Sequence, residues 1–237
     1  MILIPCAGAG KRWQDFLGGP KHLAVVEGAR LIDRLVSRLH EYAPGQAIGI
    51  IAPDQRYHVP GAALLAPPPP EFGCGIDKIH CCWPYWSANY RTWIIWGDLW
   101  LSRAGARRIF EPGKSGIQWF GRCGPSARNH KAWGEIWALS FEPPDVPDLL
   151  SACCHAAYLD AAGYLDQGRA RTVYQLLHGQ DVREFARPSP EWTEIDDETE
   201  DFDSPRDLAG WQWGRLQSAA TDKPTEPPPL RPGQAAP

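Results

Sequence analysis

Short apolar runs and one amphipathic segment shape the first part of the chain. Apolar residues dominate 1–4, 47–52 and 92–96, which is typical of buried strands. Between the first two runs, apolar positions recur at helical spacing and predict an amphipathic helix over 31–42. A strand, a crossover helix and a second strand in this order predict a parallel sheet.

The rest of the chain continues this alternation. It predicts further strands over 117–120, 136–141 and 192–196, and helices over 102–111, 146–165, 169–178 and 204–216. Residues 60–75 are expected to form an irregular loop, followed by a helix that Pro84 ends. We expect one three-layer α/β/α domain over residues 1–216, with a mostly parallel sheet and a mixed edge, and a disordered proline-rich tail over 217–237.

The charge distribution changes the picture in one place. The net charge is −4, and residues 194–203 hold seven acids. Removing these seven acids leaves +3, so the rest of the chain is only mildly basic and we expect no nucleic-acid partner. Acidic runs are usually solvated loops, so a role for this one needs its own argument.

Cysteine usage and the N-terminus bear on the compartment. The seven cysteines include no Cys-x-x-Cys pair, which argues against a zinc ribbon, and the adjacent pairs Cys81-Cys82 and Cys153-Cys154 are interpreted as small buried hydrophobes. The N-terminus has neither a charged leader nor a long apolar stretch, and no segment has the length needed to span a bilayer. We expect a reduced cytoplasmic protein with no membrane partner.

Candidate chemistry is concentrated directly after the first strand. Gly8 and Gly10 allow a tight turn with outward-facing N–H groups, which can cradle phosphate oxygens. Lys11, Arg12 and Lys21 add the positive charge that a triphosphate requires. The spacing fits neither the P-loop nor the dinucleotide fingerprint. The stretch therefore predicts a nucleoside triphosphate site of another kind, although a glycine-rich turn with solvated basic residues is the simpler alternative.

The N-terminal motif resembles that of a known family. Residues 7–12 read Ala-Gly-Ala-Gly-Lys-Arg and residues 20–23 read Pro-Lys-His-Leu, similar to the opening of the MobA-like nucleotidyltransferases, which have a GT-A-like α/β fold. The resemblance implies that Lys21 and Arg12 are catalytic. It also implies a nucleotide-binding group made of Ala7, Gly8, Ala9, Gly10 and Lys11, with Gly73, Gly75 and Lys78 closing over the base and sugar.

Further resemblance supplies the expected metal ligands. Gly97-Asp98 follows the apolar strand 92–96, where this family carries a metal-binding aspartate, and the carboxyl end of a central strand is where α/β sheets bind ligands. Glu194-Ile195-Asp196, the acidic run and the helix after it resemble choline-phosphate cytidylyltransferase-like members. We expect Asp98, Glu194 and Asp196 to hold Mg²⁺. Asp201 and Asp203 are second choices, because the run could fold back.

The resemblance implies a nucleotidyltransferase. Such an enzyme would transfer a nucleoside monophosphate from an NTP, with CTP, UTP or GTP all plausible, to a phosphorylated small acceptor such as a sugar phosphate or phosphocholine. One alternative is a GT-A glycosyltransferase that uses an NDP-sugar, but residues 98–100 read Asp-Leu-Trp and not the Asp-x-Asp typical of those enzymes. The other alternative is a nucleotide-binding module without catalysis.

Overall fold

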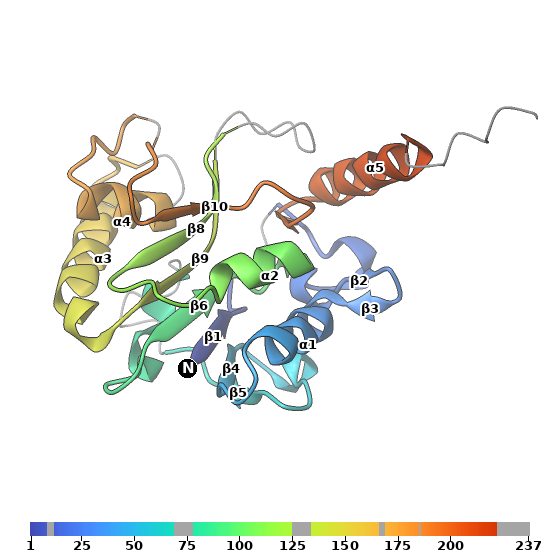
Figure 1. Ribbon diagram of the computed structural model, residues 1–237, viewed down its shortest axis with the longest axis horizontal. Coiled ribbons are helices and arrows are strands. Elements are labelled where there is room, and N and C mark those ends of the chain that lie inside the picture. Colours follow the sequence, from blue (N-terminus) through green and yellow to red (C-terminus); the bar gives the residue numbers. More distant parts are fainter. Residues whose placement is uncertain (9–11, 69–77, 125–133, 166–168, 185, 222–237) are drawn as a thin grey trace, which may run out of the picture.

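A seven-stranded sheet forms the centre of the computed structural model, which describes residues 1–8, 12–68, 78–124, 134–165, 169–184 and 186–221. Across the sheet the strands follow the order β10-β8-β9-β6-β1-β4-β5 (Figure 1). Their bounds are β1 Ile2–Pro5, β4 Ile48–Ile51, β5 Ala63–Leu65, β6 Thr92–Ile95, β8 Gln118–Arg122, β9 Glu135–Phe141 and β10 Trp192–Glu194.

The sheet is mostly parallel with a mixed edge, as the sequence predicts. β1 pairs in parallel with β4 on one side and with β6 on the other, and β4 pairs in parallel with β5. β9 runs antiparallel to both β6 and β8, while β10 pairs in parallel with β8. The carboxyl ends of β1 and β6 therefore meet at one edge of the sheet, which is where ligands bind in folds of this class.

Helices cover both faces of the sheet and complete three layers (Figure 1). α1 (Leu31–Tyr42) and α2 (Arg103–Ile109) pack on the face that receives Ile2 and Ile4, whereas α3 (Val146–Ala161) and α4 (Arg169–Leu177) pack on the face that receives Leu3. Neighbouring residues of a strand point to opposite faces, so one buried strand supplies both cores. The predicted three-layer α/β architecture is confirmed.

Several local elements differ from the sequence-based expectation. The loop expected over 60–75 contains β5, which extends the sheet beyond β4. The helix expected before Pro84 is the 3-10 helix η5 (His80–Tyr85), which includes that proline. α5 (Pro205–Thr221) continues past Leu216 and extends away from the rest of the molecule (Figure 1). Most of the expected tail, residues 222–237, lies outside the described residues.

Shorter elements surround the carboxyl edge of the sheet. β2 (Val25–Val26) pairs with β3 (Ala29–Arg30), and β7 (Leu99–Trp100) pairs with β11 (Glu200–Asp201). Besides η5, the described residues include the 3-10 helices η1 (Phe16–Gly18), η2 (Lys21–Leu23), η3 (Gln55–Tyr57) and η6 (Pro143–Asp145). Among the described residues, no helix is long and apolar enough to cross a membrane.

Candidate active site

Charged side chains from distant parts of the chain meet at the carboxyl edge of β1 and β6. Lys21 begins η2, in the connection that follows β1, and Asp98 follows β6. Lys78 lies just before η5, and Asp203 lies just after β11. The arrangement of the parallel strands brings these four residues together, although up to 182 positions separate them in sequence.

Asp98 is the centre of this group. Its side chain is fully buried, and it forms ion pairs with the ammonium groups of Lys21 and Lys78. The Lys78 Nζ atom lies 3.2 Å from both carboxylate oxygens of Asp98. The Lys21 Nζ atom also donates to Asp203 Oδ1 at 2.6 Å, so this ammonium lies between two carboxylates. The expected site residues Lys21, Lys78 and Asp98 are thus close together in the structure.

The ion pairs set the protonation states. Burial alone would raise the pKa of Asp98, but the Lys21 and Lys78 ammonium groups hold that pKa well below its usual value. Burial would likewise lower the pKa of Lys21, but the carboxylates of Asp98 and Asp203 raise it above its usual value. Both groups therefore carry their charges at neutral pH, and the site presents fixed charges in a region with little water.

Arg12 lies at the outer end of the same group. Its guanidinium donates to Asp203 Oδ2 at 2.5 Å, while 69% of its side chain is exposed. Asp203 therefore bridges Arg12 at the surface and Lys21 in the interior. Burial and the nearby Asp98 charge would raise the pKa of Asp203, but Lys21 and Lys78 hold it below its usual value. A chain of alternating charges runs from the surface to Asp98.

Gly97 is required by close packing next to Asp98. A Cβ atom at this position would lie 2.3 Å from Cys6 Sγ and 3.1 Å from the Pro5 carbonyl oxygen, which is too close for any side chain. The ring of His22 would lie 3.2 Å away. Glycine therefore lets the end of β6 pack directly against the end of β1, and this contact fixes Asp98 beside Lys21.

The acidic run 194–203 is anchored, and its residues 199–202 are buried. The Ser102 hydroxyl donates to Asp197 Oδ2 at 2.6 Å, and the Ser102 N–H donates to Thr199 Oγ1 at 3.2 Å. β11 then pairs antiparallel with β7, which places Asp201 opposite Leu99. Because Leu99 directly follows Asp98, this pairing brings the end of the acidic run to the buried carboxylate. The interpretation of the run as a solvated loop is therefore wrong for residues 199–202.

Among the described residues, one group of three carboxylates could hold a metal ion: Asp98, Asp201 and Asp203. Each contributes one oxygen, and these oxygens lie within 4.8 Å of one another. Asp98 and Asp201 are buried, and Asp203 is partly buried. Carboxylate oxygens are the ligands that Mg²⁺ prefers, so the donor set fits that ion.

Glu194 and Asp196 are placed differently from the sequence-based expectation, and neither belongs to this group of carboxylates. Glu194 accepts hydrogen bonds from the Cys123 N–H at 3.1 Å and from Trp192 Nε1 at 3.0 Å. The Asp196 carboxylate is 71% exposed and lies 3.9 Å from Arg122 Nε. The reason is the strand order: β10 is the edge strand, and β8 and β9 separate it from β6, so its carboxyl end does not adjoin Asp98. Positions 194 and 196 do share one face, but that face is exposed.

The expected phosphate-binding turn is described only in part. β1 ends at Pro5, and the following Ala7 is half-buried and Gly8 exposed. Ala9, Gly10 and Lys11 lie outside the described residues, as do Gly73 and Gly75. Their proposed roles rest on the sequence alone.

An aromatic cluster near the site was not assigned a role from the sequence. Trp13, Trp100 and Trp211 are buried together with Phe202 and Leu208. The Trp13 Nε1 atom donates to the Gly19 carbonyl at 3.0 Å, just before Pro20-Lys21. Trp13 directly follows Arg12, Trp100 belongs to β7 and Trp211 belongs to α5, so the cluster packs these three segments together. It thereby supports the segments that carry the charged residues. The high tryptophan content is the sequence signal that could have indicated it.

His22 gives the site a testable pH dependence. Burial lowers the pKa of His22 from 6.5 to about 4, and its Nδ1 atom has no hydrogen-bond partner within the described part of the chain. The unfolded chain therefore protonates His22 more readily than the folded protein does. The His22 contribution to the unfolding free energy is fully present above about pH 6.5 and is lost as the pH falls toward 4. This lowering of the His22 pKa corresponds to about 3 kcal/mol of unfolding free energy.

A His22→Leu variant is expected to lose this component of the pH dependence. Urea unfolding at pH 7 and pH 4.5 measures the change in unfolding free energy for both proteins. The neighbouring Asp98, Lys21 and Lys78 are common to both, so the difference between the two pH responses isolates His22. Equal responses would show that His22 is not held neutral in the folded protein.

Comparison with known proteins shows which solved structures share the fold of this chain. No protein-family profile matches the sequence, and no curated protein matches it. Among solved structures, the chain is similar to a CTP:phosphocholine cytidylyltransferase from Streptococcus pneumoniae, with a TM-score of 0.55 and 16% identity over 91% of this chain and 98% of that one. It is also similar to the inositol-1-phosphate CTP transferase from T. maritima, with a TM-score of 0.55 and 11% identity over 94% and 96% of the two chains. The protein therefore has the fold of these nucleotidyltransferases.

Proposed function

We propose that the protein is a nucleotidyltransferase that moves a nucleoside monophosphate from an NTP to a phosphorylated small acceptor and releases pyrophosphate. The observation that carries the proposal is the buried Asp98 carboxylate, which two lysine ammonium groups flank at the carboxyl edge of the central strands. The fold supports it, since the similar solved structures include transferases of this kind. A sugar phosphate or a phosphocholine-like compound is the proposed acceptor class.

The reaction needs positioning and charge stabilisation more than acid–base chemistry. An oxygen of the acceptor phosphate attacks the α-phosphorus of the NTP, and the bond from that phosphorus to the pyrophosphate oxygen breaks. The acceptor phosphate is already an anion, so no general base is required. Lys21 would contact the α-phosphate, and its fixed positive charge would stabilise the negative charge that grows there. Arg12, at the outer end of the site, would bind the β- and γ-phosphates.

Mg²⁺ is the proposed cofactor. The residues that would hold it are Asp98, Asp201 and Asp203. Bound there, the ion would neutralise phosphate charge and orient the triphosphate. In the structure Arg12 pairs with Asp203, Lys21 with Asp98 and Asp203, and Lys78 with Asp98. A bound Mg²⁺ would add two positive charges beside these carboxylates when Arg12 and Lys21 contact the phosphates.

The direct test is a product assay. The protein is incubated with each of the four NTPs, Mg²⁺ and a panel of sugar phosphates and phosphocholine, and pyrophosphate release is measured. Acceptor-dependent pyrophosphate release from one NTP is expected. Release of NDP from an NDP-sugar would indicate a glycosyltransferase, and nucleotide binding without turnover would indicate a binding module.

Arg12→Ala is expected to raise the KM for the NTP about tenfold with a smaller change in kcat. An exposed guanidinium that binds the outer phosphates contributes equally to the ground state and the transition state, so its loss weakens binding. Steady-state kinetics with varied NTP measures both constants. Arg56→Ala is the matched control, because Arg56 is also exposed and pairs with a local carboxylate, Asp54, at 2.8 Å. A large fall in kcat with an unchanged KM would contradict the assignment.

A further inference from the structure

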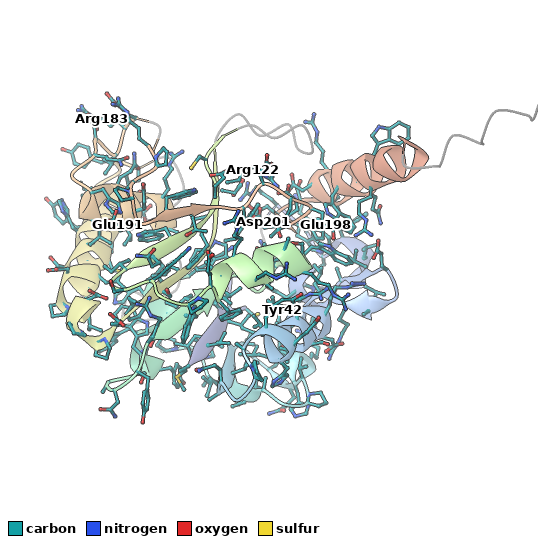
Figure 2. The ribbon with its side chains drawn as sticks, in the orientation of Figure 1. Tyr42, Arg122, Arg183, Glu191, Glu198 and Asp201 are labelled. Atoms are coloured by element: carbon teal, nitrogen blue, oxygen red, sulfur yellow. The ribbon has the colours of Figure 1, made fainter. Side chains whose placement is uncertain are left out.

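Arg122 is a buried cation that the proposed reaction does not use directly. It ends β8, and only 4% of its side chain is exposed. Its guanidinium also lies over the ring of Trp137, 4.8 Å from the ring centroid. Figure 2 labels Arg122 at the end of β8, and its guanidinium reaches Glu200 of the acidic run. Burying a guanidinium is costly unless it is paired and hydrogen-bonded, so its partners indicate what it does.

Within the part of the chain that the structure describes, its hydrogen-bond acceptors belong to the acidic run. Arg122 Nη1 donates to Glu200 Oε2 at 3.0 Å, and the Glu200 side chain is equally buried. Arg122 Nη2 donates to the carbonyl oxygens of Asp197 at 3.1 Å and Thr199 at 3.0 Å. One planar guanidinium thus contacts both the backbone and a side chain of the segment, and its donors have a fixed, spread geometry that the compact, freely rotating ammonium of a lysine lacks.

The fixed segment leads directly into two of the three carboxylates. Asp201 follows Glu200, and Asp203 lies two positions further on. On its other side the segment is tied to the strand of Asp98: β11 pairs with β7, and the Phe202 N–H donates to the Asp98 carbonyl oxygen at 3.2 Å. The acidic run is therefore held between Arg122 on β8 and the chain that follows Asp98.

We infer that Arg122 is a positioning residue that sets the carboxylates of Asp201 and Asp203 beside Asp98 and so determines the divalent-metal affinity of the site. The inference rests on the metal site of the proposed function. Groups that orient metal ligands without touching the metal usually change affinity by about 10- to 100-fold when they are replaced.

The chain offers a matched control in Arg91. This arginine is also largely buried, and it donates to the carbonyl oxygens of Gly116 at 3.1 Å and Lys114 at 2.9 Å. It pairs with the Glu142 carboxylate at 3.2 Å, as Arg122 pairs with Glu200. Arg91 lies just before β6, so it fixes a loop at the opposite edge of the sheet from the proposed metal site. A purely structural loss should be similar in Arg91→Lys and Arg122→Lys.

The experiment compares Mn²⁺ binding to the full-length wild type, Arg122→Lys and Arg91→Lys, followed by electron paramagnetic resonance without nucleotide. We expect Arg122→Lys to bind Mn²⁺ about tenfold or more weakly, and Arg91→Lys to bind it as the wild type does. Hydrogen exchange gives a second readout, in which the amides of 199–202 should exchange faster in Arg122→Lys alone. Should Arg122→Lys fail to fold, Glu200→Gln removes the ion pair while keeping the side-chain volume, and the same direction is expected.

Two results would overturn the inference in distinguishable ways. Equal Mn²⁺ affinity in folded Arg122→Lys, or in folded Glu200→Gln where the first variant does not fold, would reduce Arg122 to a structural residue and leave the proposed function intact. Absence of Mn²⁺ binding to the wild type would remove the metal site itself, and the inference with it.

Discussion

Lys21→Ala is expected to lower kcat by a factor of about 100 or more, because it removes a preorganised positive charge from the place where the transition state becomes more negative. The structure supports a role in charge stabilisation: Lys21 is buried, begins η2 after a rigid proline, and is held by ion pairs with Asp98 and Asp203. An ammonium fixed in this way reorganises little during the reaction. The KM for the NTP should change less than kcat, as steady-state kinetics with the preferred NTP can measure.

Two controls separate this catalytic loss from a loss of fold. Lys114→Ala removes another partly buried lysine, and this variant should retain kcat. The Lys114 Nζ atom donates to Thr193 Oγ1 at 2.6 Å, and neither residue belongs to the proposed site. Circular dichroism and the melting temperature test whether Lys21→Ala is folded. This check is needed because removing the ammonium leaves Asp98 with fewer compensating charges. An unchanged kcat in a folded Lys21→Ala protein would exclude Lys21 from the mechanism.

The sequence predicts the fold well because the relevant signals are local. The helix predicted over 31–42 matches α1 from Leu31 to Tyr42, since a single apolar face at helical spacing defines it. The apolar runs predict β1, β4 and β6 for a similar reason: strands buried on both faces need apolar residues throughout. β5 was missed because the edge strand Ala63–Leu65 is short and only partly buried, so its pattern is weak.

The candidate site was only partly predictable, because its two halves depend on interactions of different range. Lys21 and Asp98 follow strands whose order in a parallel sheet is predictable, so the sequence places them at one edge. The acidic run depends on Arg122, which is 78 positions from its partner Glu200, and on the pairing of β11 with β7. No local pattern shows such contacts.

The clearest difference between sequence and structure concerns the metal ligands, and it leads to the largest expected effect. Asp98→Asn and Asp203→Asn are each expected to abolish metal-dependent turnover and to weaken Mn²⁺ binding about tenfold or more, because each removes one anionic oxygen from a set of three. The sequence alone would favour Asp196 as the partner of Asp98. Asp196→Asn is instead expected to behave as the wild type, because that carboxylate is exposed and lies outside the group.

Two measurements test the variants of Asp98, Asp203 and Asp196 in parallel. One is pyrophosphate release at varied Mg²⁺ concentration, and the other is Mn²⁺ binding followed by electron paramagnetic resonance. Asn keeps the size of the side chain and one oxygen, so a loss in Asp98→Asn or Asp203→Asn reflects missing charge more than missing volume. Asp98→Asn and Asp203→Asn each also remove an ion-pair partner of Lys21, and a melting curve shows whether the fold tolerates that change. Full activity in Asp203→Asn together with loss in Asp196→Asn would return the metal to the ligands expected from the sequence. Full activity in both would remove Asp196 and Asp203 from the metal ligands and leave Asp98 and Asp201 beside Lys21 and Lys78.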